Sequence, residues 1–151
     1  MHIGELAVAA VFSSPTRIES AYKLGLQSRE LLELTRFCIN PKFQKKNFAS
    51  WFLSRAMKML WIDKPLVKKV ITFADTTHGH EGTIYKAANW MFVGKVKPDY
   101  WYVDELGHRY HKKTVWDHAS KMSKSEEDYA HLQKLTRIAG GMKLRYVKDK
   151  P

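Results

Sequence analysis

The residues best suited to chemistry follow an apolar stretch that ends at Asp75. His78 and His80 come next, and Tyr85 and Asn89 follow on a predicted helix. A carboxylate at the C-terminal end of a strand stands where α/β sheets bind their ligands. Asp75 is therefore a candidate general base or metal ligand, and Tyr85 a candidate proton donor or substrate anchor. The Asp-x-x-His-x-His spacing permits a metal, but it is equally typical of a capped helix start, so both interpretations stay open.

Arg36 lies in a second apolar stretch, residues 31–39, whose alternation predicts a largely buried strand. Burying an arginine costs free energy unless the guanidinium is paired. Arg36 is therefore expected beside Asp75, either as a structural salt bridge or as part of a substrate clamp. Cys38, in the same strand, is expected to be a small buried hydrophobe rather than a nucleophile.

A basic loop then leads into the next predicted helix, with Lys42, Lys45 and Lys46 close to the helix start. Free backbone N–H groups and the helix dipole at such a start attract anions. The loop is therefore a candidate phosphate site. An ordinary solvated loop is the alternative.

A basic and aromatic segment surrounds a hairpin turn predicted at residues 104–107. Cations neutralise phosphates and aromatic faces stack on bases, so this segment is the candidate grip on nucleic acid. An exposed basic hairpin with ordinary core aromatics is the alternative. The residues proposed for this grip are Trp101, Arg109, His111, Lys112 and Lys113.

Hydrophobic periodicity predicts the elements that must position these side chains. The expected strands cover residues 6–12, 31–39, 67–74, 90–94 and 143–147, the first of them central in its sheet. The expected helices cover residues 48–60 and 123–139, with Ser125 as N-cap of the latter and a short helix from residue 84 between them. Two successive strand-to-helix units predict parallel or mixed pairing. We expect an α/β (α+β) fold in which helices flank a mixed central sheet, formed by residues 1–151 as a single domain.

The positive net charge of the chain indicates which class of partner it binds. Among 151 residues, 26 Lys and Arg against 15 Asp and Glu leave +11. A basic domain rich in aromatic residues suits nucleic acid better than a membrane, although solubility alone is an alternative. No apolar run approaches the ~20 residues that cross a bilayer, and the N-terminus lacks the charged region of a secretion signal. A single cysteine fits a reducing cytosol, so we expect a cytoplasmic protein.

The order of elements from about Leu32 to Gly94 resembles the GNAT family of N-acetyltransferases. That family binds the pyrophosphate of its cofactor with a Gln/Arg-x-x-Gly-x-Gly/Ala loop, and Asn47 stands here where glycine is usual. The resemblance implies acetyl-CoA or a related CoA thioester as cofactor. The residues implied to hold it are Gln44, Lys45, Lys46, Asn47, Phe48 and Ala49.

A more specific likeness is to the phage Mom proteins, an offshoot of the same fold. It is carried by residues 33–36, 50–56, 73–75, 79–90 and 111–115, in this order along the chain. The resemblance implies that Arg36, Ser50, Asp75 and Tyr85 serve the reaction. That reaction adds a carbamoylmethyl group to adenine N6 in double-stranded DNA, in the bacterial host, and protects the DNA from restriction.

The Mom family also carries a His-Tyr pair upstream of the strand expected first here, and its histidine is implicated in binding iron. The sequence has no such pair before that strand, so the metal is unknown and iron stays an open alternative. Two further functions stay open. One is an acetyl-CoA-dependent acetyltransferase acting on a small amine or a protein, and the other is a non-catalytic DNA-binding protein. A homodimer is likewise open.

Overall fold

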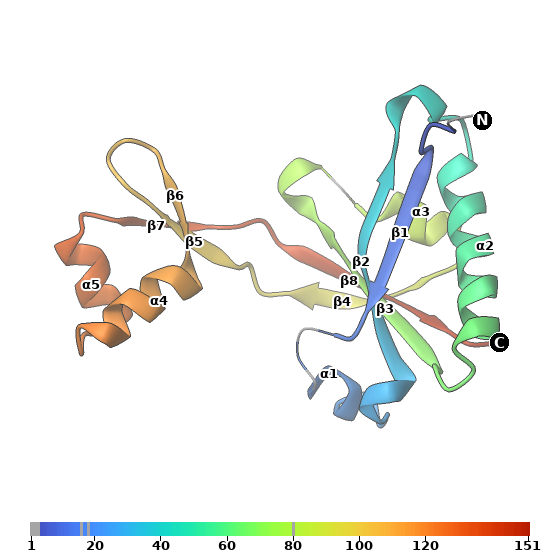
Figure 1. The fold of residues 1–151 in the computed structure, drawn as a ribbon, viewed down its shortest axis with the longest axis horizontal. Coiled ribbons are helices and arrows are strands. Elements are labelled where there is room, and N and C mark those ends of the chain that lie inside the picture. The colour runs from blue at the N-terminus through green and yellow to red at the C-terminus, as the bar shows by residue number, and fades with distance from the viewer. Residues whose placement is uncertain (1–3, 16, 18, 80) are drawn as a thin grey trace.

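The computed structural model describes residues 4–15, 17, 19–79 and 81–151, which form two sheets (Figure 1). The larger sheet has five strands in the order β1-β2-β3-β8-β4, and the smaller has three in the order β6-β5-β7. The strands of the larger sheet are β1 (Val8–Ser13), β2 (Leu31–Ile39), β3 (Lys69–Asp75), β4 (Met91–Val96) and β8 (Lys143–Asp149). Those of the smaller sheet are β5 (Tyr100–Val103), β6 (Arg109–His111) and β7 (Thr136–Ala139).

Figure 1 shows these sheets in two parts, which we call the body and the lobe. The body holds the larger sheet with helices α1 (Glu19–Tyr22), α2 (Phe48–Asp63) and α3 (Thr83–Ala87). The lobe, residues 97–141, is inserted between β4 and β8 and holds the smaller sheet with α4 (Lys112–Lys121) and α5 (Glu126–Leu132). Within the described residues, no helix is long and apolar enough to cross a bilayer.

The larger sheet is mixed, which confirms the predicted α/β class. Strand β2 pairs antiparallel with β1 and parallel with β3. The C-terminal strand β8 lies between β3 and β4 and is antiparallel to both. The second predicted strand is confirmed at residues 31–39, and the last predicted strand extends to Asp149.

Helix α2 covers the sheet with Leu53 and Met57, which are 0% and 2% exposed. The predicted helix at residues 48–60 is confirmed and continues for three more residues before Lys64-Pro65. Leu53 and Met57 define the buried face of this helix, whereas Met59 is 64% exposed. Val70 and Tyr146 belong to the same core.

Three sequence predictions on β1 and β2 were wrong. Strand β1 is an edge strand rather than a central one. Arg36 and Cys38 are exposed rather than buried. Arg36 and Cys38 are exposed because β3 pairs with β2 only at residues 31–33. The second half of β2 therefore has a sheet neighbour on one side alone.

The lobe corrects another prediction. The helix expected over residues 123–139 ends at Leu132, although Ser125 does cap it, since the Ser125 hydroxyl oxygen accepts from the Asp128 N–H at 3.0 Å. Lys134 then adopts a left-handed conformation with φ 54°. Thr136–Ala139 pairs with β5 as strand β7. The β-branched residues Thr136 and Ile138 favour a strand, and pairing with β5 stabilises the strand over the predicted helix.

Candidate active site

Strands β2 and β3 stop pairing part-way along their length, and a cavity lies between them in the body. Their parallel pairing stops at Glu33 and Ile71, while each strand continues on its other neighbour to Ile39 and Asp75. A cavity of about 410 Å³ lies where the strands separate. It is lined by Leu34–Cys38 of β2, Thr72–Asp75 of β3, Gly79, and residues 81–85 at the start of α3. A volume of this size suits a small ligand or one nucleobase.

Thr72 lines the cavity just beyond the last paired residues of β2 and β3. Its buried hydroxyl donates to the Leu34 carbonyl oxygen at 3.1 Å, which satisfies an acceptor left by the separating strands. The same hydroxyl lies 3.4 Å from the Tyr85 hydroxyl. The Tyr85 ring contacts Trp90 and Tyr146, with centroids 5.7 Å and 5.4 Å away. Tyr85 is thus held by packing, with its hydroxyl toward Thr72.

Asp75 ends β3 and begins the 3-10 turn η3 (Thr76–His78). Its Oδ1 accepts hydrogen bonds from the Thr77 N–H at 2.9 Å and the Thr77 hydroxyl at 2.5 Å. The capping role that the sequence left open is therefore present. It orients the carboxylate of a residue that lines the cavity, and capping is compatible with acid–base chemistry.

The cavity brings together three of the four residues predicted to serve a reaction: Arg36, Asp75 and Tyr85. Arg36 donates to the Thr35 carbonyl oxygen at 2.9 Å. Within the described parts of the chain it forms no ion pair with Asp75, so the predicted salt bridge is absent there. Ser50 lies outside the cavity lining, in the first turn of α2, where its hydroxyl donates to the Asn47 carbonyl oxygen at 3.1 Å.

The loop predicted to bind phosphates joins β2 to α2, and Gln44, Lys45 and Lys46 are exposed on it. Asn47, immediately before α2, adopts φ 63° and ψ −2°. This left-handed conformation is the one that glycine adopts most easily, and asparagine is among the few other residues that tolerate it. The change from the family's usual glycine therefore keeps the backbone geometry of the loop. Phe48 and Ala49 form the first turn of the helix.

Asn47 gives a prediction on stability. Its side chain makes no capping hydrogen bond, so Asn47→Gly is expected to leave stability close to wild type. Asn47→Val should cost about 1–2 kcal/mol, because a β-branched residue resists positive φ. Thermal unfolding of the three proteins measures the difference. Equal behaviour of the glycine and valine variants would contradict the role assigned to this backbone conformation.

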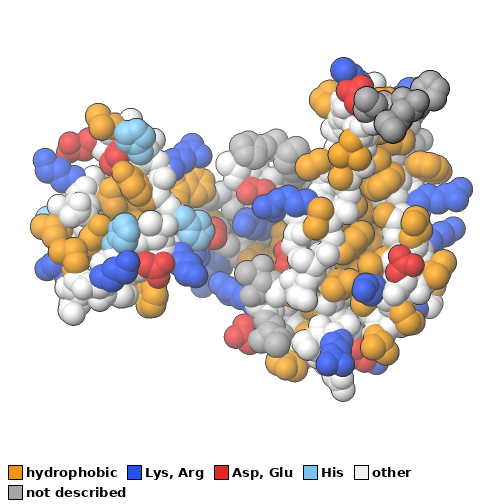
Figure 2. Space-filling model, in the orientation of Figure 1, with side chains coloured by type: hydrophobic (Ala, Val, Ile, Leu, Met, Phe, Trp, Pro, Cys, Tyr) orange, Lys and Arg blue, Asp and Glu red, His pale blue; other side chains and the backbone are white. Residues whose placement is uncertain are grey.

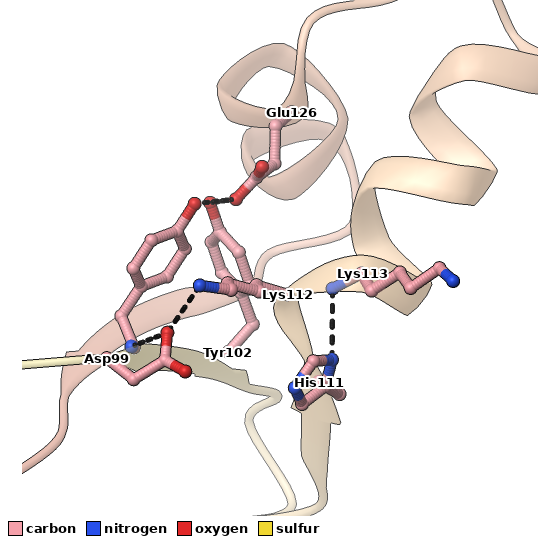
Figure 3. Close-up of polar contacts among 7 residues, drawn as sticks. Asp99, Tyr102, His111, Lys112, Lys113 and Glu126 are labelled. Carbon is pink, nitrogen blue, oxygen red and sulfur yellow. Dashed lines mark hydrogen bonds and ion pairs between the residues drawn. The ribbon is translucent and has the colours of Figure 1, made fainter. Parts of the chain in front are cut away.

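The lobe residues predicted to bind nucleic acid are partly engaged within the lobe (Figure 3). Lys112 pairs with Asp99 at 2.5 Å, and this bond is the main cause that holds the pKa of Asp99 below its ordinary value. Arg109 lies over the Trp101 ring at 5.2 Å. The His111 ring accepts from the Lys113 N–H at 3.2 Å and so caps α4. The Lys113 side chain is exposed, and binding by all five residues stays a prediction.

Tyr100 and Tyr102 of the lobe are structural, whereas Tyr110 and Trp116 are exposed. Tyr102 is 2% exposed, and both it and Tyr100 donate to Glu126 at 2.8 Å (Figure 3). Burial, with Glu126 adding to it, raises the pKa of Tyr102 to about 12. Arg137 and Lys112 lie over the Tyr100 ring, at 3.7 Å and 5.2 Å. These rings therefore build the lobe rather than offer open faces for stacking.

The positive charge belongs to the body. The lobe carries eight Lys and Arg against seven Asp and Glu, whereas the rest of the chain carries 18 against eight. Four of the seven histidines are in the lobe, and those in view in Figure 2 lie there. Attraction to a polyanion therefore acts mainly on the body, which holds the cavity and the basic loop.

The part of the chain that the structure describes contains no cluster of three His, Cys, Asp or Glu side chains able to hold a metal. His80 and the side chain of His78 lie outside that part. The expectation of iron gains no support from the described residues.

The structure adds cavity residues that sequence reasoning missed, above all Thr72, Gly82 and Cys38. Thr72 had a usable signal, because it is the one hydroxyl in an apolar strand that ends at a candidate catalytic acid. Gly82 and Cys38 gave no such signal. Their importance depends on Tyr146, far along the chain, and on where β3 separates from β2.

Solved acetyltransferases share this architecture. A GNAT family acetyltransferase from Elizabethkingia anophelis with acetyl-CoA bound has a TM-score of 0.53 at 11% identity, covering 99% of this chain and 72% of that one. For a Bacillus subtilis acetyltransferase in complex with CoA the TM-score is 0.51 at 10% identity, over 100% and 74% of the two chains. For a ribosomal-protein-S5-alanine acetyltransferase from Vibrio fischeri it is 0.52 at 9%, over 96% and 57%. At these identities the likeness shows the fold alone, which is the GNAT fold.

Sequence comparison narrows the family. The methylcarbamoylase Mom of Escherichia phage Mu is 30% identical over 92 residues, which span 61% of this chain and 37% of the phage protein. The model of the Mom protein family matches residues 2–148. Because this match covers nearly the whole chain, the chain belongs to the Mom protein family.

Proposed function

We propose that this protein modifies phage DNA in the host cytoplasm by adding a carbamoylmethyl (acetamido) group to adenine N6, which protects the DNA from host restriction. The observation that carries the proposal is the cavity between β2 and β3, which places Arg36, Asp75 and Tyr85 around one space in a Mom-family chain.

The proposed chemistry is a displacement at the donor carbon. Adenine N6 forms a bond to the methylene carbon of the donated acetamido unit and gives a proton to Asp75, while the leaving group on that carbon departs with the electrons of the broken bond. Asp75 suits this role because it lines the cavity and Thr77 orients its carboxylate. Tyr85 positions the base. Arg36, which lines the cavity and forms no ion pair within the described residues, holds the donor.

A base in a duplex must leave the stack before its N6 can enter such a cavity. The net charge of the body favours holding DNA there during this step, since cations replace the counterions of phosphates. The lobe residues Trp101, Arg109, His111 and Lys113 are proposed as additional DNA contacts. Lys112 is the weakest member of that set because Asp99 already pairs with it.

The cofactor is proposed to be acetyl-CoA or a related CoA thioester, which would supply an activated acyl group when bound. Because a thioester transfers its acyl group through the carbonyl carbon, the carbamoylmethyl group itself requires a donor that carries the leaving group on the methylene carbon of an acetamido unit. The residues present fit its phosphates, since Lys45 and Lys46 are exposed beside the N-terminus of α2 and Asn47 keeps the glycine-like backbone. Phe48 and Ala49 contribute the first turn of that helix. Gln44 lies at the start of the same loop.

Mass spectrometry of nucleosides tests the reaction. Plasmid DNA from cells that express the protein is digested to nucleosides and compared with DNA from cells that lack it. The proposal predicts an adenosine derivative with the mass of an added carbamoylmethyl group, together with resistance of the plasmid to adenine-sensitive restriction enzymes. Unmodified adenine in every digest, with soluble protein present, would refute it.

A second candidate function is acetyl transfer from acetyl-CoA to a small amine or a protein. The basic loop before α2 favours it as much as it favours DNA modification, because the loop concerns the donor alone. Calorimetry with acetyl-CoA, combined with the nucleoside analysis, separates the two. Tight binding of acetyl-CoA without any change to DNA would favour this candidate.

A further inference from the structure

The Thr77 hydroxyl lies between the Asp75 carboxylate and the chain that returns from the lobe. It donates to Asp75 Oδ1 at 2.5 Å, and the Thr77 backbone N–H donates to the same oxygen at 2.9 Å. Two donors from one residue restrict rotation of the carboxylate, since hydrogen bonds to an ionised group are short and strong. Asp75 is thus oriented by Thr77.

On its other side, the Thr77 hydroxyl oxygen accepts a hydrogen bond from the Gly141 N–H at 3.0 Å. A hydroxyl has one proton and two lone pairs, so it can donate to Asp75 and accept from Gly141 at once. The contacts form a continuous chain from the last residue of the lobe to the carboxylate in the cavity.

Close packing makes this contact specific to glycine. A Cβ on Gly141 would lie 2.1 Å from Thr77 Oγ1 and 2.6 Å from Thr77 N. Gly140 is also close to its neighbours, since its N–H donates to the Asp99 carbonyl oxygen at 2.6 Å and a Cβ there would lie 2.9 Å from that oxygen. The Gly-Gly pair thus lets the chain leaving the lobe contact both η3 and the chain that enters the lobe.

We propose that Thr77 is a positioning residue of this site. It sets the orientation of the Asp75 carboxylate, and it makes that orientation depend on the position of the lobe. The inference rests on the proposed role of Asp75. It gives the lobe a part in the reaction besides contact with DNA. A ligand that moves the lobe must move Gly141, and through the Thr77 hydroxyl it disturbs the carboxylate.

The neighbouring Thr76 offers a matched control. Its hydroxyl and its N–H both donate to the Met142 carbonyl oxygen, at 2.7 Å and 3.0 Å, without contact to the carboxylate. Thr77→Val is expected to lower kcat for DNA modification by about 10–100-fold with KM for DNA unchanged, because a misplaced catalytic group costs about this much. Thr77→Ser, which keeps the hydroxyl, should restore kcat, and Thr76→Val should retain most of it. Equal kcat in Thr77→Val and Thr76→Val would overturn the inference.

A second readout does not need activity. Thr77→Val removes the acceptor of the Gly141 N–H, so amide hydrogen exchange at Gly141 should become faster, whereas Thr76→Val should leave it unchanged. Unaltered exchange at Gly141 in Thr77→Val would overturn the link to the lobe. If the wild-type protein leaves DNA unmodified, the proposed function fails, and the exchange measurement alone then decides whether the Thr77 hydroxyl binds Gly141 of the lobe.

Discussion

Asp75→Asn is expected to reduce DNA modification by about 10²–10⁴-fold, the usual contribution of a general base. Asparagine has nearly the volume of aspartate, and its Oδ1 can still accept from the Thr77 N–H and hydroxyl, so the turn η3 should survive. Asparagine cannot take the proton from N6. The measurement is the fraction of modified adenine nucleoside at matched levels of soluble protein, with circular dichroism as the check on folding.

Glu81→Gln is the matched control for Asp75→Asn. Glu81 lines the same cavity, and its substitution removes the same unit of charge. Only its backbone carbonyl oxygen has a described role, as the acceptor of the Tyr146 hydroxyl at 2.7 Å. Modification should therefore stay near the wild-type level. Equal losses in both variants would assign the effect to cavity charge. Protection from restriction that survives in Asp75→Asn and Tyr85→Phe without any modified adenine would indicate a non-catalytic DNA-binding protein.

Gly82→Ala is expected to destabilise the protein by about 2–5 kcal/mol and to damage the cavity that Gly82 lines. A Cβ at Gly82 would lie 2.3–2.6 Å from Cε2, Cζ and the hydroxyl oxygen of Tyr146. That ring cannot yield easily, since it is fully buried and its hydroxyl is bound to Glu81. Overpacking a core costs roughly 1–3 kcal/mol, and a left-handed backbone with φ 71° adds about 1–2 kcal/mol for alanine.

Gly79→Ala separates the clash from the backbone strain. Gly79 has φ 72°, almost the same as Gly82, but a Cβ there would meet no atom within 4 Å. Its cost should therefore be the strain alone, about 1–2 kcal/mol. Thermal unfolding measures the difference, with Gly82→Ala expected to lose about 5–15 °C. Equal melting temperatures for the two variants would show that Tyr146 does not confine this glycine.

Local patterns predicted the elements that carry the site. Alternating apolar residues marked β2, and the strand that ends at Asp75 was evident from its apolar run. These features depend on neighbours in sequence, and so does the Ser125 cap of α5. The resemblance to the Mom family predicted that Arg36, Asp75 and Tyr85 serve the same reaction. The cavity brings these three together, while Ser50 lies outside it.

The rest depends on contacts between distant segments. Arg36 and Cys38 looked buried because their strand is apolar, and they are exposed because β3 separates from β2 after Ile71. The sequence of β7 fits the end of a helix, and pairing with β5 makes it a strand. The central position of β8 and the coupling of Gly141 to Thr77 likewise follow from the way the lobe interrupts the sheet. Sequence periodicity carries no information on such pairings.

Cys38 allows a direct test of the cavity as the reaction site. It is the single cysteine of the chain, it is exposed, and it lines the cavity. The measurement is DNA modification by the protein before and after stoichiometric labelling with N-ethylmaleimide, with Cys38→Ser treated in parallel. If transfer takes place between β2 and β3, the labelled wild-type protein loses activity while the treated Cys38→Ser protein keeps it. Full activity of the labelled wild-type protein would contradict a reaction in this cavity.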